Sequence, residues 1–290
     1  MRNRRKKTIL IWSVIGLVLI IAGWFSFGPS SDAHVSSRVV TVGVVGQTKA
    51  DAAIWKSVSE TAKRKYDITI QIKNFTDYNQ PNKALENGDI DLNAFQHFAF
   101  MSAWNKANKG NLVSIGKTMI APIRLYSLKY HTLNQLPNDA TIAIPNDASN
   151  ESRALYVLKN AGLITLKKGK KIVTIADIVE NPHHFHIEEV ATEQTGRIIK
   201  SVDASVVNND YATPAKLGKK QTIFVEPVNK DSAQWINLIA SRRQDRHRQL
   251  YLDVVKAYQT AKTKRLYQKY YGDTEIAGWD INLNGKEKEK

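Results

Sequence analysis

Residues 38–46 read RVVTVGVVG, a run of β-branched residues that ends in glycine. A run with apolar residues on both faces is typical of a strand buried in a parallel sheet. Residues 50–65 follow with apolar side chains at helical spacing, and residues 68–72 alternate apolar and polar side chains as a second strand does. This strand–helix–strand order predicts an α/β domain with a largely parallel sheet.

The same alternation continues along the chain. Turn-forming residues separate the apolar segments, such as the Asn87-Gly88 pair and Gly162. The further elements that we expect are a helix over residues 77–85 with Asp77 as its N-cap, strands beginning at residue 90 and over residues 141–144, 204–207 and 223–225, a helix over residues 151–161, and one long helix over residues 250–271.

Two α/β units in one chain predict two lobes. We expect lobe 1 to comprise residues 39–120 plus 229–290, and lobe 2 to comprise residues 121–228. The chain would then cross between the lobes near residues 120 and 228, and crossings of this kind serve as hinges. A cleft between two lobes is a common place for a small ligand.

The N-terminus carries a membrane signal. Residues 1–8 form a basic segment, and residues 9–27 are almost entirely apolar. Nineteen residues at a helical rise of 1.5 Å span about 28 Å, close to the ~30 Å core of a bilayer. Trp12 and Trp24 lie near the two ends of this run, where aromatic belts form. The pattern predicts a transmembrane anchor whose basic end stays in the cytoplasm, so that the rest of the chain is extracytoplasmic.

A cleaved signal peptide is the alternative for this segment. Its apolar region would be shorter, about 7–15 residues, and residues 31–33 (SDA) match a cleavage site poorly. Residues 28–37 are rich in Gly, Pro and Ser and are expected to be a linker. We therefore expect a single-pass protein of the cell membrane with its soluble part outside.

Composition excludes several classes of site. The 290 residues include no cysteine, which excludes disulfides, thiolate metal sites and a lipid-anchored cysteine within them. The formal net charge is +15, but the Lys and Arg residues are spread along the chain. We interpret them as a solvated surface and expect no nucleic-acid partner. No nucleophile elbow or phosphate loop is present, so we expect no catalytic activity and no cofactor.

Several short strings occur in a specific order and spacing. They are residues 77–82 (DYNQPN), 88–97 (GDIDLNAFQH), 142–147 (IAIPND), 153–155 (RAL), 177–182 (DIVENP), 207–208 (VN), 211–212 (YA), 224–226 (FVE) and 235–239 (WINLI). Together they resemble the NlpA-type, methionine-binding lipoprotein family of ABC importers, over nearly all of residues 39–270. The resemblance implies a two-lobed, periplasmic-binding-protein-like fold of type II, here preceded by a transmembrane helix.

The resemblance also implies a function and a site. The chain would be an extracytoplasmic substrate-binding protein that delivers a free amino acid, foremost L-methionine, to a permease driven by an ATPase. Arg153 would pair with the ligand carboxylate, and Asn208 and Asn237 would bind its polar end. The residues that would enclose its side chain are Tyr78, Phe95, His97 and Phe100.

The residue types fit these roles. Arginine offers a fork of donors that matches a carboxylate, and an asparagine amide supplies both a donor and an acceptor. A thioether packs favourably against aromatic rings.

The sequence departs from the family in three places. Phe100 stands where a tyrosine is usual, residues 195–197 (TGR) replace a Leu-Pro-Arg string, and the lipid-bearing cysteine is absent. The first two changes leave other ligands open, such as another amino acid or a methionine-containing dipeptide. An enzyme on the same fold and a surface adhesin are the alternatives from other classes.

Residue type alone favours plainer roles for parts of the site. It predicts a structural, hydrogen-bonded role for His97 and an exposed helix position for Arg153. His183, His184 and His186 suggest a metal site, but no fourth ligand completes the set and we expect no metal.

Overall fold

The computed structural model describes residues 38–46 and 48–283. The predicted basic segment, membrane span and linker, residues 1–8, 9–27 and 28–37, lie outside the described residues. Within the described ranges, no helix combines the length and the apolar composition that a membrane crossing needs.

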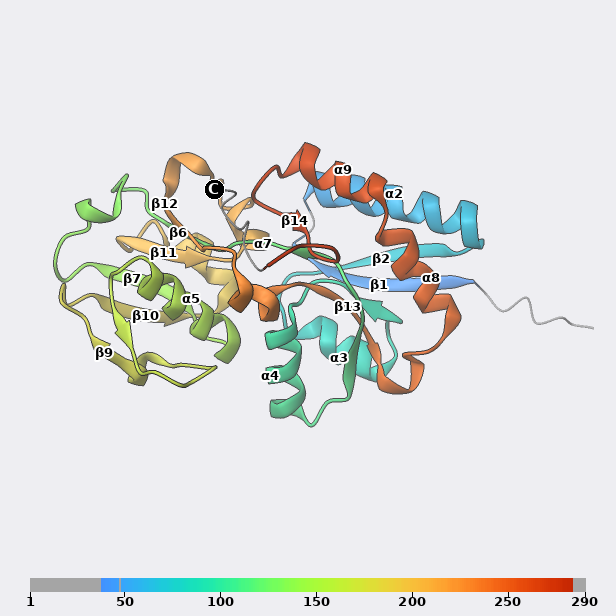
Figure 1. Ribbon diagram of the computed structural model, residues 1–290, viewed down its shortest axis with the longest axis horizontal. Helices are drawn as coiled ribbons and strands as arrows, with labels where there is room; N and C mark the ends of the chain where they lie inside the picture. The colour runs from blue at the N-terminus through green and yellow to red at the C-terminus, as the bar shows by residue number, and fades with distance from the viewer. Residues whose placement is uncertain (1–37, 47, 284–290) are drawn as a thin grey trace, which may run out of the picture. The chain divides into compact units, whose positions relative to one another are not determined.

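The first sheet has five strands in the order β2-β1-β3-β13-β4. Figure 1 labels β1, β2 and β13 of this sheet. Strand β1 pairs in parallel with β2 and β3, whereas β13 runs antiparallel to β3 and β4. The strands are β1 (Val39–Val45), β2 (Thr69–Phe75), β3 (Leu92–Asn93), β4 (Leu112–Lys117) and β13 (Leu238–Arg242).

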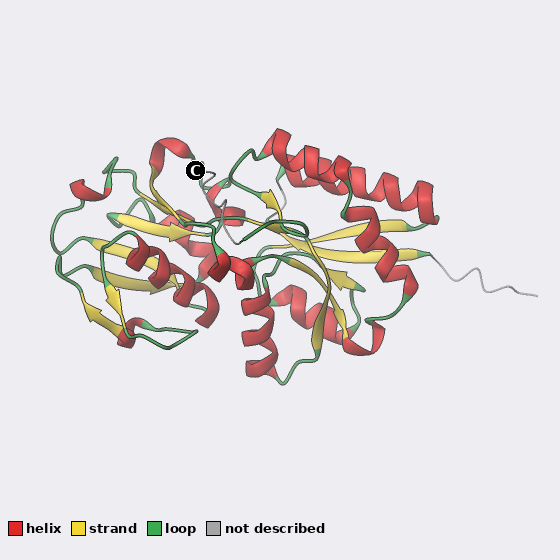
Figure 2. Ribbon diagram, in the orientation of Figure 1, coloured by secondary structure: helices red, strands yellow, loops and turns green. Residues whose placement is uncertain are grey.

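Helices cover both faces of this sheet (Figure 2). One apolar core joins β1 to α2 (Lys49–Tyr66), α8 (Gln249–Tyr258) and α9 (Ala261–Tyr270). A second core joins the other face to α3 (Gln80–Asn87) and α4 (Phe98–Asn108). Because both faces are buried, β1 reads as the continuous apolar run seen in the sequence.

The second sheet has the order β10-β7-β11-β6-β12. Strand β7 is parallel to β10 and β11, and β6 is antiparallel to β11 and β12. Apolar residues of α5 (Ala148–Asn160) pack on this sheet, and the short helices α6 (Thr195–Ile198) and α7 (Asn209–Ala212) flank β11. The strands are β6 (Arg124–Tyr126), β7 (Thr141–Pro145), β10 (His186–Val190), β11 (Ala204–Val207) and β12 (Thr222–Val225).

The chain passes from the first sheet to the second between β4 and β6, and it returns between β12 and β13. A small ladder of β5 (Met119–Ile120) with β14 (Ile276–Ala277) lies on the outgoing path, and β8 (Thr165–Leu166) pairs with β9 (Ile178–Glu180). We use lobe 1 and lobe 2, with the predicted boundaries, as names for the residues around each sheet.

The prediction of one helix over residues 250–271 is wrong. The helix ends at Tyr258, because Gln259 leaves the helical conformation with ψ of 64°. Thr260 then caps α9, and its hydroxyl accepts a hydrogen bond from the Thr263 amide at 3.1 Å. The break lets Tyr258 and Tyr267 both enter the core, where their hydroxyls hydrogen-bond to each other.

Two smaller boundaries also differ. The helix α3 begins at Gln80 rather than near Asp77. The Asp77 carboxylate still accepts hydrogen bonds from the amides of Asn79 and Gln80, at 2.8 and 2.9 Å. The third strand begins at Leu92, two residues later than expected.

Candidate binding site

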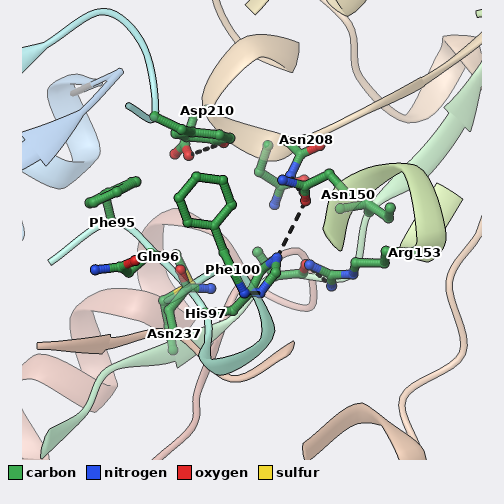
Figure 3. A pocket seen from close by; sticks show the side chains of 14 residues that line it. Phe95, Gln96, His97, Phe100, Asn150, Arg153, Asn208, Asp210 and Asn237 are labelled. Carbon is green, nitrogen blue, oxygen red and sulfur yellow. Dashed lines mark hydrogen bonds between the residues drawn. The ribbon is translucent and has the colours of Figure 1, made fainter. Parts of the chain in front are cut away.

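A pocket with about 410 Å³ of empty space, part of it open to solvent, lies between residues of the two lobes (Figure 3). The structure brings all seven predicted site residues to this pocket: Tyr78, Phe95, His97, Phe100, Arg153, Asn208 and Asn237.

Lobe 1 supplies an aromatic wall. Tyr78 precedes α3, Phe95 follows β3, and Phe100 lies in the first turn of α4. The ring centroid of Tyr78 is 5.6 Å from that of Phe95 and 5.7 Å from that of Phe100. These spacings are typical of packed aromatic pairs, which hold each other in place. The wall is therefore a preformed apolar surface on one side of the pocket.

His97 combines a structural role with a place in the pocket. Its Nδ1 accepts a hydrogen bond from the Phe100 amide at 3.0 Å and so caps α4. Because Nδ1 is an acceptor, Nε2 carries the proton and donates to Asn150 Oδ1 at 3.3 Å. Burial, assisted by the nearby Arg153 cation, lowers the pKa of His97 to about 3. The imidazole is therefore neutral, and it offers no charge to a ligand.

Arg153 lies in the middle of α5, and the expectation that it is exposed is wrong. Its side chain is only 2% exposed. Nε donates to Glu226 Oε1 at 2.8 Å, and Nη2 donates to Glu226 Oε2 and to the Ala121 carbonyl. The guanidinium also lies 5.1 Å from the ring centroid of Trp235. None of these bonds uses Nη1, which remains as a donor on the guanidinium.

Asn208 provides the acceptor that complements this donor. It follows β11, and its Nδ2 donates to Asn150 Oδ1 at 2.9 Å. Its Oδ1 is buried and has no hydrogen-bond partner among the described residues. A buried acceptor without a partner costs about 1–3 kcal/mol, so a ligand that donates a hydrogen bond here recovers this energy.

Asn237 reaches the pocket from lobe 1, on the returning segment before β13. Its backbone N–H donates to the Met119 carbonyl at 2.7 Å, and its carbonyl accepts from the Thr118 amide at 2.8 Å. The backbone of Asn237 is thus anchored to the outgoing segment, where the chain crosses between the lobes.

Comparison with known proteins adds to this geometry. Residues 40–279 match the sequence profile of the family described as NlpA lipoprotein. The chain belongs to the NlpA lipoprotein family. A relative in this comparison, the probable D-methionine-binding lipoprotein MetQ of Pasteurella multocida, is 37% identical over 246 residues, which are 84% of this chain and 87% of the relative.

Solved structures agree with this family and its fold. The substrate-binding protein of a methionine transporter from Streptococcus pneumoniae has a TM-score of 0.78 and 39% identity, covering 83% of this chain and 96% of that one. A nutrient-binding protein from Burkholderia cenocepacia, solved bound to methionine, has a TM-score of 0.78 and 37% identity, covering 82% and 99%. The two-lobed α/β fold expected from the sequence is thus confirmed for this NlpA-family chain.

The structure adds site residues that the sequence reasoning missed. In this NlpA-family pocket, Asn150 connects the two lobes, since its Oδ1 accepts from both His97 and Asn208. Its Nδ2 is held by the Asp147 carboxylate at 2.9 Å. Gln96 also lines the pocket, but its amide is bound within lobe 1 by Asn82 and Asn93.

Asp210 is a further residue that the sequence reasoning missed. The Tyr78 hydroxyl donates to Asp210 Oδ2 at 2.6 Å, a direct bond between the lobes. Burial raises the pKa of Asp210 to about 7, the Asp51 carboxylate acts in the same direction, and the Tyr78 hydroxyl opposes them. One signal could have pointed to Asp210: it closely follows the carboxyl end of a strand, where α/β folds bind ligands.

The histidine-rich segment does not form a metal site in the described part of the chain. No group of three His, Cys, Asp or Glu residues there is arranged to hold a metal ion. His183 instead has its Nδ1 2.9 Å from Asn138 Oδ1, and His184 occupies a turn with φ of 54°.

Proposed function

We propose that this chain is the extracytoplasmic substrate-binding protein of an ABC importer and that its ligand is methionine, foremost L-methionine. One observation carries the proposal: the Arg153 guanidinium with its free Nη1 and the unpartnered Asn208 Oδ1 line the same pocket as an aromatic wall. A free amino acid has a carboxylate for the first group and an ammonium for the second.

The aromatic wall suits the methionine side chain. A thioether gains about 0.3–1.5 kcal/mol per contact with an aromatic ring, and Tyr78, Phe95 and Phe100 offer three rings. Relatives described as D-methionine-binding, and a similar structure bound to methionine, support the same ligand class. Neutral His97 adds no cation to compete for the carboxylate.

The role in transport follows from the two lobes. A ligand that contacts both lobes favours the closed form by its differential affinity for that form. The contacts come from Tyr78 and His97 on one lobe and from Arg153 and Asn208 on the other. In our proposal the closed, loaded protein delivers methionine to the permease and ATPase subunits of the importer, with no catalytic step of its own.

Attachment to the membrane would use the apolar residues 9–27. Relatives of this family are described as lipoproteins, but this sequence contains no cysteine that could carry a lipid. We therefore propose a single-pass anchor with the lobes on the extracytoplasmic side. Membrane fractions should contain the full-length chain, and a mature N-terminus near His34 in mass spectrometry would contradict the anchor.

Calorimetry tests the ligand. The full chain in mild detergent would be stripped of bound ligand by partial unfolding and refolding, and then titrated with L-methionine, D-methionine, leucine and a methionine-containing dipeptide. We expect saturable binding of one methionine per chain that exceeds the binding of leucine. No binding of either methionine, with clear binding of another member of the panel, would assign a different ligand.

A further inference from the structure

Glu226 is a buried carboxylate that is not among the residues predicted to contact the ligand. It directly follows β12, at the point where the chain leaves the second sheet, and its side chain is 8% exposed. Both of its oxygens are occupied: Oε1 accepts from Arg153 Nε, and Oε2 accepts from Arg153 Nη2 and from the Ile123 amide at 3.1 Å. Its own amide donates to the Ile123 carbonyl at 3.0 Å.

This carboxylate fixes the orientation of Arg153. Two parallel bonds between a guanidinium and a carboxylate define the plane and the rotation of the guanidinium. The Ala121 carbonyl takes the remaining Nη2 hydrogen at 2.9 Å, and Trp235 packs against the guanidinium. With Nε and Nη2 both bound, only Nη1 is left to face a ligand.

The same contacts join both crossings of the chain. Ala121 and Ile123 lie on the outgoing path, whereas Glu226 and Trp235 lie on the return path. The proposed ligand donor is therefore bound to both segments that connect the lobes.

We infer that Glu226 is the positioning residue of the site: it holds the Arg153 guanidinium so that Nη1 is presented to the ligand carboxylate, and it ties that guanidinium to the two crossing segments. The inference rests on the proposed function, since it assumes an amino-acid carboxylate at Arg153. A buried arginine without a partner would also be costly, so the pair keeps the cation in place before a ligand arrives.

The test measures L-methionine affinity of the ligand-stripped full chain in mild detergent, by equilibrium dialysis with labelled methionine. Glu226→Gln keeps one acceptor but sets an amide N–H against the guanidinium, so the fork is lost. Removing a residue that orients a metal ligand typically lowers the metal affinity of the site by about 10–100-fold. By analogy, we expect Glu226→Gln to lower the affinity for L-methionine by at least about tenfold. Glu226→Asp keeps the charge but shortens the reach, and it should also weaken binding.

Two further variants separate positioning from a general structural role. Glu151→Gln is the matched control. Glu151 lies on α5, the helix that carries Arg153, is 6% exposed, and accepts a hydrogen bond from the Ile175 amide. The affinity of this variant for L-methionine should stay within about twofold of wild type. Arg153→Lys cannot form the fork. In that background Glu226→Gln should therefore change affinity by less than about threefold.

Four outcomes decide the inference. The inference is overturned if Glu226→Gln binds L-methionine within about threefold of wild type, or more tightly than wild type. Such a result would mean that an Arg153 guanidinium without the Glu226 fork binds the ligand carboxylate equally well. An equal loss in the Arg153→Lys background would also overturn it. If Glu226→Gln does not fold in a thermal melt, the same criteria apply to Glu226→Asp. A wild-type chain that binds no methionine would instead contradict the proposed function.

Discussion

Replacing Arg153 by alanine should damage both ligand binding and the fold. The substitution removes the proposed carboxylate donor, and it leaves Glu226 buried without its cation. Truncating one partner of a desolvated charge pair costs about 2–5 kcal/mol of binding free energy. Since about 1.4 kcal/mol corresponds to a tenfold change in the dissociation constant, the constant for L-methionine should increase by a factor between roughly 30 and several thousand.

The stability effect follows from the burial of the pair. Breaking a buried ion pair by removing one partner costs about 3–5 kcal/mol. For a body of this size, 1 kcal/mol corresponds to about 2–4 °C, so the ligand-free protein should melt about 6–20 °C lower. An exposed Arg153, as residue type alone predicts, would have left the melting temperature unchanged.

A double variant separates the two effects. Arg153→Ala combined with Glu226→Leu removes the unpaired carboxylate, so it should recover most of the lost stability but none of the affinity. Calorimetry with L-methionine and thermal melts of the ligand-free proteins measure both quantities. If Arg153→Ala binds within about threefold of wild type, the carboxylate is held elsewhere and our placement of the site is wrong.

Three further predictions concern the pocket wall, closure and pH. Phe100→Tyr should retain affinity or improve it by about 0.5–1.5 kcal/mol, because a hydroxyl can gain a polar partner there, and a tenfold loss in calorimetry would show a pocket rebuilt for another ligand. L-methionine should reduce the radius of gyration in small-angle scattering, and an unchanged scattering profile at saturating L-methionine would contradict closure. Tyr78→Phe, which removes the bond to Asp210, should make the ligand-free protein more open. Because the pKa of His97 is lowered to about 3, its stabilising contribution should be lost as pH falls from about 6.5 to 3, and His97→Gln should remove that slope from thermal melts. Because the pKa of Asp210 is raised from 3.8 to about 7, its contribution to the stability of the fold should be lost as pH rises through that window. Asp210→Asn should abolish this second dependence of the melting temperature on pH. If both variants retain the pH dependence of the wild type, the assignments are wrong.

Local sequence patterns predicted several of the strands, but not β4, β6, β10 or β13. The boundaries of β11 agree with residues 204–207, and those of β1 lie within residues 38–46, because each is a short apolar run that is buried on both faces. The break between α8 and α9 was missed. The spacing of Tyr251, Val254, Val255, Tyr258 and Leu266 fits one continuous helix, whereas in the structure the residues around the cap at Thr260 separate two helices.

The site required more than local pattern. Residue types alone assigned Arg153 to the surface, and only the family resemblance assigned it to a ligand. The Tyr78–Asp210 bond joins residues 132 positions apart, so no local signal could predict it. Glu226 was visible within a family string, but its pairing with Arg153 joins residues 73 positions apart and depends on the tertiary fold.

Native mass spectrometry of the full chain, released from mild detergent, tests the central claim most directly. Binding proteins often retain their ligand through purification, and the bound mass identifies it without a prior choice of candidate. The account predicts a species heavier than the chain by one methionine, and its loss in Arg153→Ala. A retained ligand of another mass, or methionine that Arg153→Ala retains equally well, would contradict it.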